Sequence, residues 1–171
     1  KRQMLFSGGT DHIRFPIYEE DQIKPLVPWE ERKPLCAVVA NKHYSILGNN
    51  PSPSFQQALK DQLHDARYTA FNYFKLSGLL DLYGHGWGDG YGISTANKVD
   101  TMRDYKFALC FENVSQSGYI TEKIIDCFVA GVIPIYMGAP DVNDHISQWA
   151  KPGRLVFSAK SINQMDRFMS D

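Results

Sequence analysis

The residues with the richest chemistry stand together in the stretch FENVSQSGYITEK, residues 111–123. It joins two apolar runs, yet it carries the amide of Asn113, the phenol of Tyr119, the carboxylate of Glu122 and the ammonium of Lys123. A plain connection between core segments needs a turn and little more. This combination can bind an anion and form hydrogen bonds with sugar hydroxyls.

The same stretch leads into a predicted helix over residues 121–130, which begins at Thr121 or a neighbour. The first N–H groups of a helix lack partners within it and, with the positive end of the dipole, they suit a phosphate. Lys123 would add a mobile positive charge that the dipole alone disfavours, and an anionic ligand would remove that penalty. Taken singly, each residue also has an ordinary interpretation: Asn113 in a turn, Glu122 as a first-turn acid, Lys123 in solvent. The stretch alone therefore names no substrate.

Short apolar runs alternate with helical patterns along the chain. This alternation predicts an α/β, Rossmann-like fold with a mostly parallel sheet and helices on both faces. The predicted strands cover residues 35–40, 79–83, 105–111, 132–137 and 154–157. The predicted helices run from a cap at Ser54 through Phe74 to a stop at Gly78, and over residues 95–105, 121–130 and 160–169.

Stretch 111–123 then follows a strand and opens a helix. Ligands of such sheets bind beyond the carboxyl ends of the strands, so this is a place where a ligand is expected. Pro134 is awkward in a central strand because it lacks an N–H donor, and an edge position or a strand end would accommodate it. Residues 1–34 show no clear periodicity and predict an irregular lead-in.

Composition excludes several classes of protein. Eighteen Lys plus Arg against 19 Asp plus Glu leave a net charge of −1 over 171 residues, so a general nucleic-acid surface is not indicated. Cys36, Cys110 and Cys127 each lie in an apolar stretch and are predicted to be free buried thiols. No apolar run approaches the length of a membrane span, and no signal peptide is recognisable.

Two other motifs are weaker. The loop GHGWGDGYG, residues 84–92, fits neither G-x-G-x-x-G nor a P-loop. It is either a surface loop that needs positive φ or a place where Trp87 or His85 lies beside a sugar. No D-x-D occurs and the five histidines are scattered, so no metal site is expected.

The stretch YKFALCFENVSQSGYITEKIIDCFVAGVIPIYMGAP, residues 105–140, resembles the signature of the α-1,3/4-fucosyltransferases, glycosyltransferase family 10. It has, in order, Y-K-F, F-E-N, a spacer, Y-[IVL]-T-E-K, an amphipathic helix, then [VI]-P-[VI] and a Gly. A weaker resemblance upstream includes a strand ending at Asn41 and an Arg fourteen residues before an Asp, which Arg67 and Asp81 match. The resemblance covers about residues 35–160.

The resemblance implies one half of a GT-B architecture, in which residues 35–171 form the domain that binds the donor GDP-fucose. It implies inverting transfer of fucose to a glycan acceptor, without a metal or another cofactor. Lys123 and Arg67 would bind the pyrophosphate, and Asn113 and Tyr119 would contact the nucleotide or its phosphates. Glu122 would bind sugar hydroxyls and stabilise the oxocarbenium-like transition state as the catalytic residue of this domain.

In the family, the general base belongs to an N-terminal acceptor domain. Residues 1–34 are too few to form one and are interpreted as its remnant or as a linker from it. Two alternatives stay open: a noncatalytic nucleotide-binding module, and a transferase that uses another nucleotide sugar. The resemblance is compatible with a bacterial cytoplasmic protein, membrane-associated or not, and with a Golgi protein whose anchor was removed. The sequence gives no indication of an oligomer.

Overall fold

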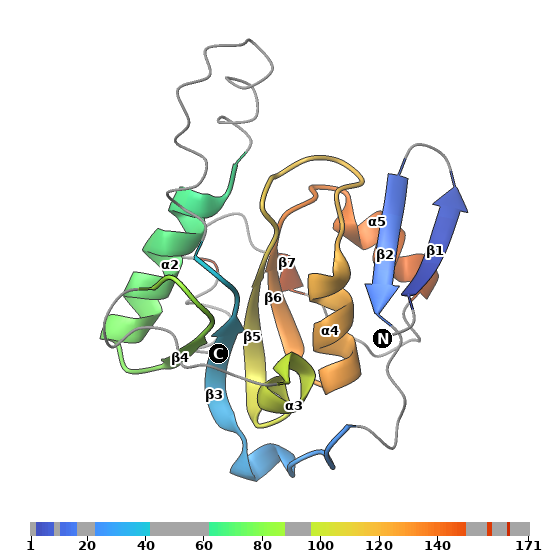
Figure 1. The fold of residues 1–171 in the computed structure, drawn as a ribbon. Helices are drawn as coiled ribbons and strands as arrows, with labels where there is room; N and C mark the ends of the chain where they lie inside the picture. The colour runs from blue at the N-terminus through green and yellow to red at the C-terminus, as the bar shows by residue number, and fades with distance from the viewer. Residues whose placement is uncertain are drawn as a thin grey trace.

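A five-stranded sheet forms the centre of the molecule in a computed structural model (Figure 1). The structure describes residues 3–8, 11–16, 23–41, 62–87, 97–149, 157–158 and 164. All neighbouring strands are parallel, which confirms the predicted fold class. Their order across the sheet is β4 (Leu80–Tyr83), β3 (Lys33–Val38), β5 (Tyr105–Phe111), β6 (Ile133–Met137) and β7 (Phe157–Ser158).

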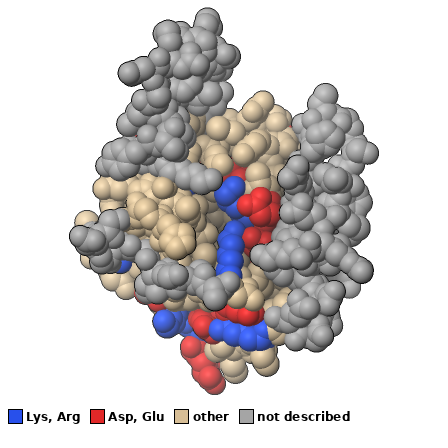
Figure 2. All heavy atoms as spheres, in the orientation of Figure 1, with Lys and Arg blue, Asp and Glu red and all other residues tan. Residues whose placement is uncertain are grey.

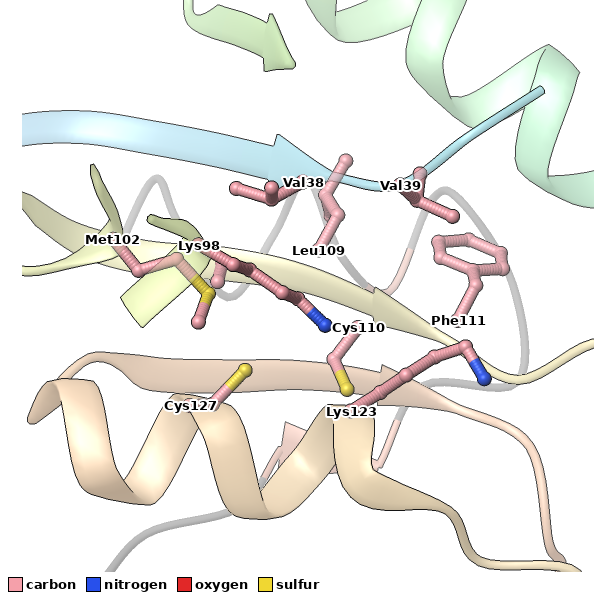
Figure 3. A pocket seen from close by; sticks show the side chains of 10 residues that line it. Val38, Val39, Lys98, Met102, Leu109, Cys110, Phe111, Lys123 and Cys127 are labelled. Carbon is pink, nitrogen blue, oxygen red and sulfur yellow. The ribbon is translucent and has the colours of Figure 1, made fainter. Parts of the chain in front are cut away.

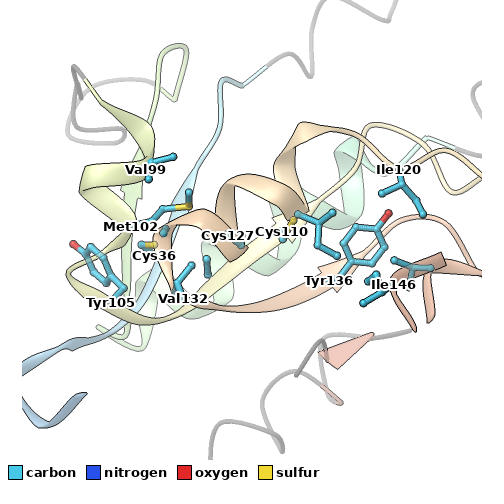
Figure 4. Packing of buried hydrophobic residues seen from close by; sticks show 14 of the residues in the cluster. Cys36, Val99, Met102, Tyr105, Cys110, Ile120, Cys127, Val132, Tyr136 and Ile146 are labelled. Atoms are coloured by element: carbon cyan, nitrogen blue, oxygen red, sulfur yellow. The ribbon is translucent and has the colours of Figure 1, made fainter. Parts of the chain in front are cut away.

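Helices cover both faces of this sheet. Because side chains alternate along a strand, β5 sends Leu109 and Phe111 to one face and Ala108 and Cys110 to the other. The first face packs against α2 (His64–Leu76), and the second against α3 (Lys98–Met102), α4 (Glu122–Ala130) and α5 (Val142–Trp149). Figure 4 shows the second of these two buried clusters.

Helix α2 presents one buried side to the sheet. Arg67, Ala70, Phe71 and Phe74 follow helical spacing and are all buried, and three of them join Leu35 and its neighbours in the core. Gly78, with φ of 74°, follows the helix, as the stop predicted there requires. The predicted cap at Ser54 lies outside the described residues, and Leu63 precedes the first helical residue.

Helix α4 begins at Glu122, one residue after the predicted start, and ends at Ala130 as predicted, with Gly131 as the C-cap. Gly131 has φ of 70° and its N–H donates back to Phe128, which is the left-handed helix end that glycine favours. Helix α5 was not predicted. Its two inward residues, Val142 and Ile146, are four positions apart, a pattern too short to distinguish from a loop.

The expectation of an irregular lead-in over residues 1–34 was wrong for its first part. Strands β1 (Gln3–Gly8) and β2 (Asp11–Pro16) pair antiparallel, and β2 contacts α4. The pair is local, since Gly8 pairs with Asp11 and Phe6 with Ile13. Two runs with apolar residues joined at Gly8-Gly9 were the sequence signal for this hairpin. The assignment of the segment to another domain stays a prediction.

Pro134 is accommodated by its position at the start of β6. It pairs with Ala108 of β5 on one side, and the described pairing with β7 begins only at Ile135. The missing N–H of proline therefore falls near a strand end, as expected.

Helix α3, Lys98–Met102, is shorter than the helix predicted over residues 95–105, because a turn at residues 103–104 leads into β5. The predictions for residues 88–92, 95–96, 154–156 and most of 160–169 lie outside the described residues, although Gln164 is helical.

The strand order creates a switch point at the carboxyl ends of the neighbouring strands β3 and β5. In the sheet, β3 lies between β4 and β5. The chain leaves β3 toward α2, which covers one face of the sheet, and leaves β5 toward α4, which covers the opposite face. The connections that leave these two neighbouring strands therefore diverge. Such a switch point is where open α/β sheets bind ligands.

Candidate donor-binding site

A buried carboxylate occupies the corner where β5 leaves the sheet. Glu112 has no exposed surface, and its Oε1 accepts a hydrogen bond of 2.8 Å from the N–H of Thr121. Its Oε2 accepts from the Thr121 hydroxyl at 2.7 Å and from the Lys123 ammonium at 2.8 Å. A buried charge is tolerated only when it is paired and hydrogen-bonded, and Glu112 meets both conditions.

Lys123 is held in this corner and is not the mobile charge that the sequence suggested. Its side chain is 16% exposed, and Nζ donates to Glu112 and, at 2.8 Å, to Thr121 Oγ1. The carboxylate supplies an anion for a cation in the first turn of α4. The unfavourable interaction of Lys123 with the helix dipole is therefore offset within the protein, and it no longer implies an external ligand.

The start of α4 is nevertheless open to an anion. Thr121 is the N-cap residue, but no side-chain hydrogen bond caps the helix, because its hydroxyl is committed to Glu112 and Lys123. The N–H groups of the first turn have no partner within the helix. Uncapped donors and an adjacent ammonium form an arrangement that suits a phosphate group.

Arg67 reaches the same corner from α2. It is 2% exposed, and one guanidinium nitrogen donates to the carbonyl of Glu112 at 3.0 Å and to Asn113 Oδ1 at 3.1 Å. Burial lowers the pKa of this guanidinium from its ordinary value. Its Nε has no hydrogen-bond partner, which leaves an unpaired buried donor beside the corner.

Asn113 ties the corner to the beginning of α2. Its carbonyl accepts from the N–H of Leu63 at 2.9 Å, and Gln62 forms an isolated antiparallel bridge with Val114. The structure thus brings Arg67, Asn113 and Lys123 together around Glu112, although their sequence positions span three elements.

The other two predicted residues lie at the edge of this arrangement. Glu122 is the first residue of α4 and is exposed. Tyr119 is half-buried, and its N–H donates to the carbonyl of Gln116 in the loop before α4. Both stand next to the helix start, so their proposed contacts with a donor stay predictions.

Gly138, the glycine of the family signature, makes room for the buried carboxylate. A Cβ at this position would stand 2.6 Å from Glu112 Cγ and 2.4 Å from the hydroxyl of Tyr136. That hydroxyl accepts from the N–H of Ala139 at 3.1 Å, and burial, with the nearby Glu112, raises the pKa of Tyr136. Any larger residue at Gly138 would displace one of these two side chains.

A hollow opens beside the corner, between the ends of β3 and β5 and helices α3 and α4 (Figure 3). It is a small depression, partly open to solvent, and its lining includes Val39, Phe111, Lys98 and Lys123. Lys98 is paired with the buried carboxylate of Asp126 at 2.8 Å, and that carboxylate raises the pKa of Lys98 despite burial. In Figure 2, basic and acidic side chains gather over the same part of the surface, along α3 and the beginning of α4.

Asp141 fixes the loop that leads into α4. Its carboxylate accepts from the hydroxyl of Ser117 and from the N–H of Gly118 at 3.0 Å, and His145 lies 3.4 Å away. The hydrogen bond from Ser117, followed by that from Gly118, lowers the pKa of Asp141 to about 2. The loop before the helix start is thereby attached to the beginning of α5.

Trp87, a candidate for sugar stacking, packs in this structure against the core. Its indole N–H donates to the carbonyl of Val39 at 2.8 Å, and its ring lies 5.2 Å from that of Phe71. Gly84 beside it has φ of 122°, and a Cβ there would stand 2.2 Å from Val39 O. The first part of the glycine-rich loop therefore has a packing role beside β3, where only glycine fits.

Sequence reasoning missed two residues of the corner, Glu112 and Lys98. Glu112 was quoted within F-E-N without a role, although a carboxylate directly after the apolar run 107–111 indicates a buried partner. For Lys98 the only signal was its position just after Asn97, which caps α3 through bonds to Val99 and Asp100.

The described residues contain no group of three or more His, Cys, Asp or Glu side chains that could hold a metal ion. The three cysteines are free and buried, as predicted. No helix in the described part of the chain is long and apolar enough to cross a membrane.

The fold and the site together define a parallel α/β domain with a cluster of charged and polar side chains at its switch point. Residues 57–154 match the sequence model described as glycosyltransferase family 10 (fucosyltransferase) C-term. Because this match covers more than half of the chain, the protein belongs to glycosyltransferase family 10.

Individual proteins show the same relationship. The chain is 34% identical over 127 residues to alpha-(1,3)-fucosyltransferase FucT of Helicobacter pylori, covering 70% of this chain and 24% of that protein. It is 29% identical over 105 residues to human 4-galactosyl-N-acetylglucosaminide 3-alpha-L-fucosyltransferase 9, covering 56% of this chain and 28% of that protein. The chain thus spans about a quarter of the length of these relatives.

The fold is also found in solved structures. A crystal structure of alpha1,3-fucosyltransferase with GDP-fucose superposes with a TM-score of 0.57 at 23% identity, covering 84% of this chain and 36% of that one. A second structure, with GDP, gives the same TM-score at 24% identity. At these identities the likeness supports the fold alone.

Proposed function

We propose that this chain is the donor-binding part of an enzyme that transfers fucose from GDP-fucose to a glycan hydroxyl with inversion of the anomeric configuration. The observation that carries the proposal is the uncapped start of α4 at the switch point of the sheet, with Lys123 and Arg67 beside it. These groups match a diphosphate in charge and in hydrogen-bonding capacity.

The proposed chemistry needs what this corner offers. When fucose departs, negative charge grows on a diphosphate oxygen, and fixed N–H donors with two cations stabilise that charge most where it develops. Lys123 provides a positioned ammonium and Arg67 a planar guanidinium with an unpaired Nε. The base that takes the acceptor proton acts on the opposite face of the sugar and is assigned to the acceptor side of the enzyme.

The remaining roles follow from position. Glu122, exposed at the first turn of α4, is proposed to bind the fucose hydroxyls and to stabilise the positive charge of the sugar ring. Asn113 and Tyr119 border the same opening and are proposed to contact the nucleotide. The guanine and fucose parts of the donor are proposed because a structural neighbour is a complex with GDP-fucose.

Calorimetric titration with GDP tests the proposal directly. We expect the unmodified chain to bind GDP and Lys123→Met to bind it about thirtyfold more weakly, since a charge-assisted contact contributes roughly 2 kcal/mol. Lys75→Met, on the last turn of α2, is the matched control because it removes the same charge away from the corner. Equal affinities of the chain and Lys123→Met would reject Lys123 as a phosphate ligand.

The same titration separates the alternatives. Tighter binding of UDP or ADP than of GDP would indicate another nucleotide sugar. Incubation with GDP-fucose and N-acetyllactosamine then measures fucose transfer and donor hydrolysis. GDP binding with neither reaction would favour a noncatalytic nucleotide-binding module.

A further inference from the structure

The hydrogen bonds around Lys123 form a closed triangle. A carboxylate can only accept and an ammonium can only donate, so the Thr121 hydroxyl must donate to Glu112 and accept from Lys123. Nζ of Lys123 also donates directly to Glu112 at 2.8 Å. The ammonium has three N–H groups and two acceptors, so at least one N–H is left, and among the described residues no third acceptor contacts this ammonium.

The two acceptors are themselves hydrogen-bonded to each other at 2.7 Å, so together they hold the position of Nζ and leave at least one N–H for a ligand. The side chain of Lys123 lines the hollow, and Figure 3 shows its ammonium at the Phe111 end, away from Met102 and Cys127. A ligand at that end can accept a further hydrogen bond from it. We propose that Glu112 and Thr121 are positioning residues, which hold the Lys123 ammonium so that its remaining N–H meets the diphosphate of the donor. The inference rests on the donor-binding function proposed above.

Glu112 is suited to this role because it is buried and its backbone is anchored by hydrogen bonds. It is fully buried, its N–H donates to the carbonyl of Met137 at 2.9 Å, and its carbonyl accepts from Arg67 at 3.0 Å. Gly138 leaves room for its side chain at the end of the next strand. The carboxylate is thus anchored to the sheet, whereas Lys123 belongs to the helix, and the triangle joins the two.

The negative charge of Glu112 opposes an anionic ligand, so two effects compete. The direct contact with Lys123 at 2.8 Å cancels much of the field of the carboxylate. The four-carbon side chain of Lys123 would regain its rotamer freedom without this partner and would have to be ordered again on binding. We therefore expect loss of the carboxylate to weaken GDP binding.

A double-mutant cycle with GDP as the titrant tests the proposal in the complete chain. We expect Glu112→Gln to weaken GDP binding about tenfold, and to change it less than about twofold when Lys123→Met is already present. A general structural defect would produce the same loss in both backgrounds. The cycle therefore separates positioning through Lys123 from damage to the fold.

Thr121 provides a second cycle in case Glu112→Gln does not fold. Thr121→Val removes the hydroxyl but keeps the shape of the side chain. We expect it to weaken GDP binding about fivefold when Lys123 is present, and to leave GDP binding unchanged when Lys123→Met is already present. Thr121→Ser, which keeps the hydroxyl, is expected to restore most of the affinity.

The outcomes distinguish this inference from the proposed function. Equal losses in both backgrounds, no loss, or tighter binding by Glu112→Gln would overturn the positioning role while GDP binding by the unmodified chain still stood. Absence of GDP binding by the unmodified chain would overturn the proposed function and this inference with it.

Discussion

A lysine in the first turn of a helix is unfavourable by about 0.3–1 kcal/mol at an exposed site. Here the buried carboxylate of Glu112 offsets that unfavourable energy, because a hydrogen bond between charged groups contributes about 1.5–3 kcal/mol. Glu112 and Lys123 are therefore paired even without a ligand, and the desolvation cost of a buried ion pair offsets part of this gain. An ammonium fixed in this way costs less to order when an anion arrives.

The cationic residues of the corner also lead to a prediction about metals. Lys123 and Arg67 are proposed to neutralise the diphosphate, and we therefore expect GDP affinity to change less than about twofold when EDTA replaces magnesium in the titration. The measurement is calorimetry in the two buffers at the same ionic strength. A large loss with EDTA, restored by added magnesium, would show that a metal completes the site.

The sequence predicted which residues lie in the candidate site better than it predicted the contacts between them. Arg67, Asn113 and Lys123 were all expected near a ligand, and the structure brings them around one residue. That residue, Glu112, had no assigned role, because its pairing depends on Thr121 nine positions later and on space left by Gly138 in another connection. Local patterns carry no information about such distant contacts.

The loop between β5 and α4 is held at several points. Asn113 fixes its beginning to α2, Ser115 donates to the carbonyl of Gly138 at 3.1 Å, and Asp141 holds Ser117 and Gly118. These bonds set where the loop delivers Thr121 and the helix start. The site is therefore built on anchored connections between helices and strands.

Asp141 is predicted to make the stability that the loop between β5 and α4 provides dependent on pH. Its pKa is lowered to about 2 from an ordinary value of 3.8, so its contribution to stability is present above pH 3.8 and is lost as the pH falls through 2. We expect Asp141→Asn to lower the free energy of unfolding by about 1 kcal/mol at pH 7, because a neutral acceptor forms weaker hydrogen bonds at this quarter-exposed site.

Urea unfolding of both proteins at pH 7, 5 and 3 measures this effect. The difference between them should stay constant from pH 7 to 5 and shrink clearly at pH 3. A difference of the same size at pH 3 would contradict the assigned cause of the low pKa.

Elements with a strong apolar pattern were predicted within a residue or two, as β5, β6 and α4 show. The apolar pattern was less informative where tertiary packing or strand pairing determines the limits of an element. Helix α2 begins only at His64, since Leu63 and Gln62 are bonded to the β5 connection, and β1 with β2 form by mutual pairing. The start of α2 depends on partners that are distant along the chain, whereas β1 and β2 are neighbours in the sequence and form a local hairpin.

On the scale of the whole molecule, topology decides where the chemistry can occur. Strands β3 and β5 are neighbours, but the helices that follow them lie on opposite faces, so the switch point at their ends collects residues from α2, α3 and α4. The chain spans about a quarter of the length of the relatives named above, so fucose transfer by the whole protein stays a proposal.

A crystal structure of the chain with GDP tests this account most directly. We expect phosphate oxygens within about 2.7–3.1 Å of Lys123 Nζ and of a first-turn N–H of α4, with Glu112 and Thr121 still bonded to that ammonium. A nucleotide bound elsewhere on the molecule, or Lys123 turned into solvent while GDP occupies the switch point, would contradict the account.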